Sequence, residues 1–381
     1  MWKKLLSFFK YNDWYLIINA LLLMIFSLVA LYSLQINVAQ PNYTFFNRQL
    51  IFVLAGLVIF FFSSAVNFKV WSDYYKILFG SSIVLLLIVL VIGVRIRGTS
   101  GWLEFLGQTF QPAELVKIVL IIWLAKFFTL KSKHPHLIRD ILVSAVFSGI
   151  LIGLILLQPD FGSAMILAFT WLGMVLLLPI KRRFLIGLLA VILIFGAIFW
   201  LFVFQTYQKD RLLTFIHPQS DPLGSGYNVQ QAIVAIGSGR LIGRGLGLGS
   251  QSQLNFLPEQ QTDFIFAVIA EELGLVGAGL VLILFLSLIL RVYYNAKETA
   301  DHFGHYFGLG AVILLLVQIF VNLGMNLGIA PVTGITLPLI SYGGSSLFSV
   351  LIILGIINSL HIRNRKFLFT SNRTSEPHLD I

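Results

Sequence analysis

The stretch QSQLNFLPEQQTDFIFAVIAEELG, residues 251–274, changes from a polar loop into an apolar segment without a break. Asp263 lies at this junction and is followed at once by Phe264, Ile265 and Phe266. A carboxylate is costly to desolvate where a loop enters lipid, and ionisable residues in such places usually have a function. Asp263 is therefore the first candidate for chemistry.

Two further carboxylates, Glu271 and Glu272, follow eight and nine residues after Asp263. On a helix with about 100° per residue, Glu272 points nearly opposite to Asp263, and Glu271 lies about 80° away from it. This geometry does not make a paired-carboxylate site. We assign Glu271 and Glu272 to hydrogen bonds between helices and keep Asp263 as the chemical candidate.

A second pair of charges lies in GWLEFLGQTFQPAELVK, residues 101–117, where Pro112 marks a helix start. Glu114 and Lys117 fall three residues apart on one helix face, where they can pair. A paired acid and base cost less in a membrane than either charge alone. Two interpretations stay open. The pair is either a structural lock between two helices or one wall of a polar cavity, whose mouth Trp102 would cover.

Other polar residues are candidates for contacts with a charged substrate. Asp160, in the turn QPDFGSA, most simply caps a helix, and Ser341 belongs to the segment NLGMNLGIAPVTGITLPLISYGGSS at 322–346. In this segment, small residues and Asn allow helices to approach and hydrogen-bond in lipid. Arginines could be solvated or could hold a diphosphate by bidentate contacts. The arginines considered for this role are Arg48, Arg211, Arg240 and Arg244.

The Gly-rich run at 237–249 does not match a nucleotide-binding motif. It fits neither G-x-x-x-x-G-K-[ST] nor G-x-G-x-x-G, so no nucleotide is expected, and its glycines indicate close turns. Just before it, residues 227–236 have the pattern of a short amphipathic helix lying on a membrane.

Composition identifies the elements that must carry these residues. Of 381 residues, 58% are hydrophobic and 11% are charged, so lipid must be the solvent for much of the chain. We predict an all-α integral membrane protein with one membrane domain at 1–366 and a disordered tail at 367–381. The predicted spans, about ten in number, are 14–36, 47–66, 72–94, 112–130, 138–157, 162–180, 184–205, 263–290, 304–328 and 341–361.

The basic residues predict the orientation. The net charge is +10, but the Lys and Arg cluster in short loops, a pattern that sets topology and does not indicate nucleic acid. Of the 26 Lys and Arg, the loops on one side hold 18, so both termini should be cytoplasmic. The long loop between the seventh and eighth spans, about 206–262, and Asp263 then face outward. Cysteine is absent, which excludes disulfides and thiolate metal sites.

Three strings resemble the SEDS family (shape, elongation, division and sporulation). They are SDPLGSGYN at 220–228, LPEQQTDFIFAVIAEELG at 257–274 and PVTGITLPLISYGGSS at 331–346. The resemblance covers nearly the whole chain, beginning at Arg48. QSQLNFLPE and PVTGI are more similar to the elongation branch, which forms rod shape, whereas Thr336 is typical of the division branch.

The resemblance implies a ten-span peptidoglycan glycosyltransferase at the outer face of the bacterial cytoplasmic membrane. It would polymerise lipid II into a growing glycan strand, release undecaprenyl diphosphate and pair with a class B penicillin-binding protein. It places the family's essential aspartate on Asp263, its fourth-span pair on Glu114 and Lys117, and its loop tryptophan on Trp102. Asp263 would act as a general base or would hold Mg²⁺ or Mn²⁺. Haem and flavin are not expected.

Two other functions remain open. A flippase or transporter for a lipid-linked precursor also has many spans, intramembrane charges and a Pro-broken helix. Against it, the charged motifs gather at the predicted outer face and do not line a path across the membrane. A non-catalytic scaffold that docks the penicillin-binding protein is the third interpretation.

Overall fold

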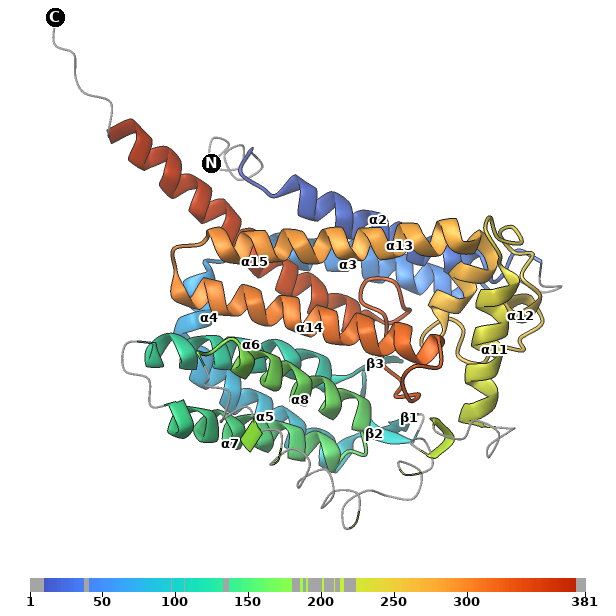
Figure 1. The fold of residues 1–381 in the computed structure, drawn as a ribbon, viewed down its shortest axis with the longest axis horizontal. Helices are drawn as coiled ribbons and strands as arrows, with labels where there is room; N and C mark the ends of the chain where they lie inside the picture. The colour runs from blue at the N-terminus through green and yellow to red at the C-terminus, as the bar shows by residue number, and fades with distance from the viewer. Residues whose placement is uncertain are drawn as a thin grey trace, which may run out of the picture.

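Most of the chain forms a bundle of long helices that run roughly along one direction (Figure 1). Within the described ranges, seven helices are long and apolar enough to cross a membrane, and α8 is a shorter apolar helix. The chain is a mostly helical, multi-pass membrane protein, as predicted. Besides isolated residues between 186 and 215, the computed structural model describes residues 10–37, 41–96, 98–105, 107–132, 137–179 and 224–374.

The long helices coincide with the predicted spans. They are α2 (Trp14–Ser33), α3 (Thr44–Ala65), α5 (Tyr75–Ile92), α6 (Pro112–Lys131), α7 (Leu137–Leu156), α8 (Phe161–Leu176), α13 (Ile265–Glu298), α14 (His302–Asn326) and α15 (Gly344–Thr374). Most of the predicted span 184–205 lies outside the described residues, so the count of ten stays a prediction. Because α15 continues to Thr374, the domain boundary predicted at residue 366 falls inside a helix.

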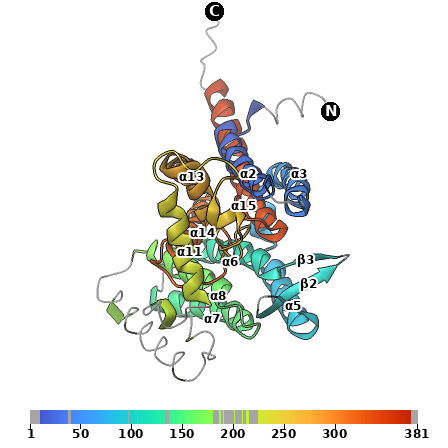
Figure 2. The same ribbon diagram turned by 90° about the vertical axis from the view of Figure 1, so that its right-hand side faces the viewer.

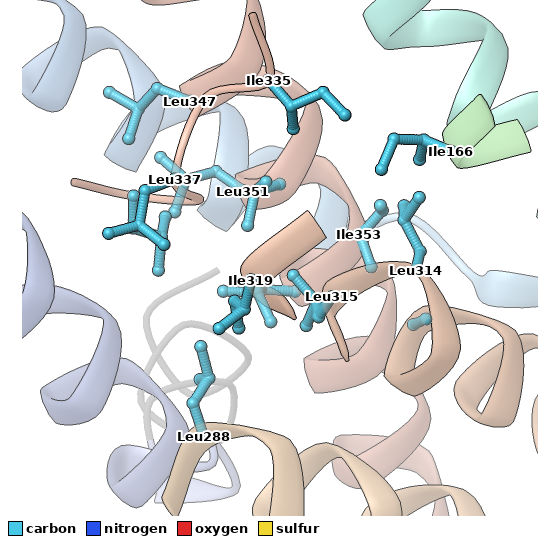
Figure 3. Close-up of a cluster of buried hydrophobic side chains, with 14 of the residues drawn as sticks. Ile166, Leu288, Leu314, Leu315, Ile319, Ile335, Leu337, Leu347, Leu351 and Ile353 are labelled. Atoms are coloured by element: carbon cyan, nitrogen blue, oxygen red, sulfur yellow. The ribbon is translucent and has the colours of Figure 1, made fainter. Parts of the chain in front are cut away.

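Two helices form the centre of the bundle. α14 packs against α6, α8 and α13, and α15 packs against α3, α6 and α13. In their most apolar stretches, 83% of α15 and 67% of α14 is buried, against 22% of α3 and 22% of α5. Figure 3 shows the apolar side chains that meet there, including Leu315 and Ile319 of α14 and Leu351 and Ile353 of α15.

The outer helices present apolar side chains away from this core. On α3, four such residues recur at helical spacing and are 58–70% exposed: Ile51, Leu54, Val58 and Phe62. An apolar stripe on the outside of a bundle is expected where lipid is the solvent. The membrane assignment therefore rests on the surface of the molecule as well as on its composition.

A small antiparallel sheet interrupts the helical fold. β1 (Val94–Ile96), β2 (Thr99–Phe105) and β3 (Gln108–Phe110) pair in the order β1-β2-β3. Gly98 and Gly107 make the turns with φ of 83° and 71°, a conformation that suits glycine. The all-helical prediction missed this sheet because its strands are too short for their periodicity to be detected.

α13 is interrupted at Gly274, where φ is 66° and ψ is −164°. The backbone of residues 240–245 fills the interruption. Its N–H groups donate to the carbonyls of Glu271 and Glu272, both at 3.0 Å, and α13 beyond the break donates back to loop carbonyls at 2.9 and 3.1 Å. A Cβ at Gly274 would lie 2.2 Å from the nitrogen of Gly243, so the two glycines permit the contact.

The sheet and two shorter helices gather at one end of the bundle. The sheet, α11 (Ser225–Ser238) and α12 (Ser250–Gln253) lie at the end where α13 and α15 begin, whereas α2 begins and α15 ends at the other (Figure 1). Figure 2 views the first end directly and shows α11 and the strands on either side of α6 and α14. α11 confirms the helix predicted at 227–236. It packs against α13 and α14.

Candidate active site

A cavity of about 650 Å³ lies at this end of the bundle. Its wall combines α3, the sheet, the first turns of α6 and α8, the start of α11 and parts of two segments, 259–264 and 332–346. Six residues singled out from the sequence line it: Asp263, Glu114, Lys117, Trp102, Asp160 and Arg48. The fold therefore brings together residues from four separate parts of the chain.

Asp263 lies in the turn just before α13, whose N-cap is Phe264, so the predicted junction is present. The residue is 7% exposed and borders the cavity. The carbonyl of Glu259 closes the turn by accepting from the N–H groups of Thr262 and Asp263, both at 3.1 Å. A Cβ built on Gly334 would lie 3.7 Å from Asp263 Oδ2. Glycine at 334 therefore leaves space beside the carboxylate.

Glu114 and Lys117 form the ion pair that their spacing predicted. Lys117 Nζ lies 2.7 Å from Glu114 Oε1, and the two side chains are 3% and 5% exposed. Ser349 Oγ on α15 donates to Glu114 Oε2 at 3.1 Å. The pair therefore joins α6 to α15 and also lines the cavity. It has the geometry expected of a lock between two helices and also that expected of a cavity wall.

Asp160 and Trp102 hold neighbouring parts of the wall. Asp160 caps α8, as predicted, by accepting from the N–H of Ser163 at 2.9 Å. Its other oxygen accepts from Gln111 Nε2 at 2.7 Å, which ties the start of α8 to the residue before α6. Trp102 Nε1 donates to Thr99 Oγ1 at 3.2 Å within the sheet. Both side chains thus border the cavity while making bonds that shape it.

Only some of the arginines considered as diphosphate ligands lie at the cavity. Arg48 lines the cavity, but Arg240 and Arg244 are not among its lining residues. The loop that carries them is bound to α13 at its break, and Arg244 Nη1 donates to Ser250 Oγ at 2.9 Å within that loop. The structure therefore does not bring Arg240 and Arg244 to the site. Arg211 lies outside the described residues.

Ser341 does not present its hydroxyl to the cavity. Its Oγ donates to the carbonyl of Thr262 at 2.6 Å and accepts from the N–H of Leu337 at 2.8 Å. Nearby, the N–H of Tyr342 donates to the carbonyl of Gln261 at 2.9 Å. These bonds attach the segment before α15 to the turn that carries Asp263. Ser341 thus supports the site and is not placed to contact a substrate.

Glu271 and Glu272 hold the loop before them. Glu271 accepts from the N–H groups of Gln251 and Ser252 at 2.9 and 3.1 Å, and Glu272 accepts from the N–H of Gly247 at 3.1 Å. The angular reason for setting them apart from Asp263 is sound. The bonds of Glu271 to the N–H groups of Gln251 and Ser252 join α13 to α12, as the prediction of bonds between helices requires, and Glu272 binds the loop at Gly247. The return of the loop onto α13 was not visible in the sequence.

The donor set limits how a metal could bind. Among the described residues, no group of three or more His, Asp or Glu could hold a metal ion. Glu114 is paired with Lys117, and both oxygens of Asp160 accept hydrogen bonds. Mg²⁺ often takes one or two protein carboxylates and fills its other positions with water and substrate phosphate. The residues fit that mode, with Asp263 as the protein ligand, and do not fit a cage built from protein groups.

The sequence model of the FtsW/RodA/SpoVE family, described as "Cell cycle protein", matches residues 13–366. The chain belongs to this family. The match begins just before α2 and ends within α15, so it contains every wall of the cavity.

Relatives from three groups of the family are similar at comparable levels. Peptidoglycan glycosyltransferase MrdB of Escherichia coli (strain K12) is 39% identical over 321 residues, covering 84% of this chain and 86% of its own. Probable peptidoglycan glycosyltransferase FtsW of Coxiella burnetii is 37% identical over 366 residues, covering 94% and 98%. Stage V sporulation protein E of Bacillus subtilis is 35% identical over 356 residues, covering 91% and 95%. These identities are too close to one another to separate the branches.

Two solved structures of the family share the fold. One chain belongs to a peptidoglycan synthase complex described as coordinating polymerization and crosslinking. It has a TM-score of 0.80 and 32% identity, covering 93% of this chain and 98% of that one. The rod shape determining protein RodA of Thermus thermophilus has a TM-score of 0.68 and 30% identity, covering 92% and 96%.

Sequence reasoning missed two residues that contact the turn of Asp263. The sequence predicts that Asn322 and Asn326 let helices approach and hydrogen-bond, but not that both donate to the carbonyl of Asp263. Their spacing of four, which places two amides on one face of α14, was the available signal. The face on which they lie could not be assigned to this turn without the fold.

Proposed function

We propose that this chain is a peptidoglycan glycosyltransferase that polymerises lipid II. The observation that carries the proposal is the buried Asp263 beside a cavity that also contains Arg48 and the Glu114–Lys117 pair. Membership of a family whose members include peptidoglycan glycosyltransferases supports it. An amphipathic substrate needs a polar site next to lipid, and the cavity combines polar walls with the apolar helix α3.

The reaction is a displacement at an anomeric carbon. The 4-hydroxyl of a GlcNAc attacks C1 of a MurNAc, the new glycosidic C–O bond forms, and the bond from C1 to the diphosphate oxygen breaks. Undecaprenyl diphosphate leaves with that electron pair, and the hydroxyl proton passes to the carboxylate of Asp263. Arg48 faces the charge that develops on the leaving diphosphate. Glu114 and Lys117 shape the wall, and Trp102 covers it from the sheet.

Asp263 has a second possible role at the same position. Asp263 would hold a Mg²⁺ or Mn²⁺ ion, which would supply positive charge for the leaving group. One carboxylate does not accept a proton and hold such an ion at the same moment. In either role the carboxylate must stand at the same point of the wall.

The orientation follows from the basic residues at the end of the bundle opposite the cavity. Lys69, Lys131, Lys297, Arg363 and Arg365 belong to α4 (Phe68–Asp73) and to the ends of α6, α13 and α15 that lie there. Cytoplasmic loops carry such an excess of Lys and Arg, which supports an orientation with the termini inside the cell and the cavity at the outer face.

We assign the chain to cell elongation and pair it with a class B penicillin-binding protein. The elongation assignment rests on the strings QSQLNFLPE and PVTGI. The partner is supported by the similar chain in a synthase complex that coordinates polymerization and crosslinking. Such a transpeptidase would crosslink the strand that this chain extends. Membrane lipid surrounds both.

Asp263→Ala tests the proposal. Purified full-length protein, with its transpeptidase partner, should convert fluorescent lipid II into glycan strands resolved on a gel. We expect Asp263→Ala to assemble with the partner and to melt near the wild-type temperature, but to polymerise at least about 100-fold more slowly. Asp263→Asn, which keeps the shape of the side chain, should behave in the same way.

Asp301→Ala is the matched control. Asp301 is also a carboxylate next to a helix start, where it accepts from the N–H of Gly304 at 2.9 Å, but it lies at the far end of α14. It should keep wild-type polymerisation. Full polymerisation by Asp263→Ala would remove this residue from the chemistry. Movement of lipid II across vesicles without any polymer would favour a transporter, and a wild-type protein inactive in both assays would favour a scaffold.

A further inference from the structure

We infer that Asn322 and Asn326, on α14, are positioning residues that fix the carboxylate of Asp263 in the cavity wall. Both asparagines are 0% exposed, although each carries an amide that is costly to bury without partners. The inference rests on the proposed function and names the groups that set the geometry of its central residue.

The first observation is a pair of hydrogen bonds to one carbonyl. Asn322 Nδ2 and Asn326 Nδ2 donate to the backbone oxygen of Asp263 at 3.1 and 3.0 Å. A carbonyl oxygen has two lone pairs, so both bonds can form at once. The N–H of Asp263 is held from the other side by the carbonyl of Glu259 at 3.1 Å. The peptide groups on both sides of the Asp263 Cα are therefore fixed.

The second observation concerns the first turn of α13. Its N-cap, Phe264, has no side-chain oxygen with which to accept from the free N–H groups of that turn. Asn326 supplies an acceptor from α14, because its Oδ1 accepts from the N–H of Ala267 at 3.2 Å, beside the bond of that N–H to the carbonyl of Phe264 at 3.0 Å. One side chain thus caps the helix and also holds the residue before its N-cap. The direction in which α13 starts is tied to the position of Asp263.

The third observation links the turn to the facing wall. Asn322 Nδ2 also donates to the carbonyl of Ile335 at 2.8 Å, in the segment that contains Gly334. The same amide therefore holds Asp263 and the segment that faces its carboxylate. Both parts line the cavity beside Asp263. Loss of Asn322 changes the separation of the walls as well as the position of the carboxylate.

Geometry of this kind affects the chemical step more than binding. Misplacement of a reacting group by about 1 Å can cost about 100-fold in rate. Asn322 and Asn326 are not among the residues that line the cavity, so the binding of substrate should change little in their variants. We therefore expect Asn322→Leu and Asn326→Leu to lower kcat by about 10- to 100-fold while KM for lipid II stays within about twofold.

Asn358→Leu is the matched control. Asn358 is also 0% exposed, and it makes three hydrogen bonds, to Asn12, Asp13 and Ser64, at the end of the bundle away from the cavity. It should lose as much thermal stability as the other two variants and keep the wild-type kcat when assayed below all melting temperatures. Should the leucine variants fail to fold, Asn322→Ser and Asn326→Ser are used instead. Serine is too short to reach the carbonyl of Asp263, but its hydroxyl can bond within the helix.

Hydrogen exchange gives a readout that does not depend on activity. In Asn326→Leu the amide of Ala267 should exchange at least about tenfold faster than in Asn358→Leu, because its bond to the Asn326 side chain is lost. If the wild-type protein makes no glycan, the proposed function fails. Unchanged exchange in Asn326→Leu would by itself overturn the inference that Asn326 holds the turn of Asp263. If the wild-type protein is active, a kcat within twofold of wild type in Asn322→Leu, or a change in KM alone, overturns the positioning role.

Discussion

Glu114→Gln should destabilise the protein by at least about 3 kcal/mol, because it leaves Lys117 charged and unpaired in a buried site. Lys117 is 3% exposed, and its Nζ lies 2.7 Å from Glu114 Oε1. Removal of one partner from such a pair costs about 3–5 kcal/mol, whereas loss of an exposed pair costs about 0–1 kcal/mol. Glutamine keeps the length of the side chain and an oxygen for Ser349, so the loss reports on the charge.

A double-mutant cycle separates the charge from the shape. Lys117→Met should cost a similar amount, since Glu114 is then the unpaired charge. The double variant Glu114→Gln, Lys117→Met leaves no buried ion, and replacement of a whole buried pair by groups of similar volume is often neutral or stabilising. We expect the double variant to be more stable than either single variant, with a coupling energy of at least about 2 kcal/mol.

The measurement is reversible unfolding of the full-length protein in detergent, combined with polymerisation of lipid II at a temperature where all variants are folded. Costs below about 1 kcal/mol for both single variants would refute the reasoning, because they would show that water in the cavity screens the pair. If the double variant regains stability and also activity, the pair shapes the wall. Regained stability without activity would instead show that the pair acts on the substrate.

Two further substitutions test the supports of the site. Gly274→Ala should release the loop at 239–249, because a Cβ would lie 2.2 Å from the nitrogen of Gly243 and φ is 66°. Proteolysis of that loop should be at least about tenfold faster. Gly279→Ala, whose Cβ would meet nothing within 4 Å, should be neutral or stabilising, and equal proteolysis of both would contradict the role of the break. Ser341→Ala should lower stability by about 1–3 kcal/mol in thermal unfolding, since it leaves the bonded groups of Thr262 and Leu337 without this partner. The exposed control Ser81→Ala should change it by under about 0.5 kcal/mol; equal losses would show that Ser341 supports nothing.

The sequence predicted those features that depend on residues close together in the chain. Long apolar runs predicted the helices, since a helix that crosses lipid must satisfy its own backbone. A spacing of three predicted the contact of Glu114 with Lys117, and the start of an apolar run predicted the junction at Asp263. Asp160 precedes a helix by one residue, which is where a cap must be.

Features that depend on distant segments could not be predicted. Arg240 and Arg244 were plausible ligands until the fold showed that their loop returns to Gly274 of α13. Asn322 looks like any asparagine in an apolar helix, and its meaning depends on a turn 59 residues earlier in the chain. The sheet depends on pairing between strands of three to seven residues, for which local periodicity is no guide.

The polar side chains buried in this bundle fall into two groups according to their hydrogen-bond partners. Irregular backbone near lipid must find partners inside the protein. One group bonds to backbone N–H or C=O groups outside the long helices and so satisfies the polar backbone of the irregular segments. Its members are Glu271, Glu272, Asn322, Asn326 and Ser341. The Glu114–Lys117 pair instead bonds side chain to side chain on the cavity wall. A buried carboxylate or amide in the sequence is therefore a weak indication of chemistry until its partner is known. This distinction explains why Glu271 and Glu272 support the loop. In Glu114→Gln, by contrast, we expect stability to fall because a buried charge loses its partner, and not because a loop becomes less ordered.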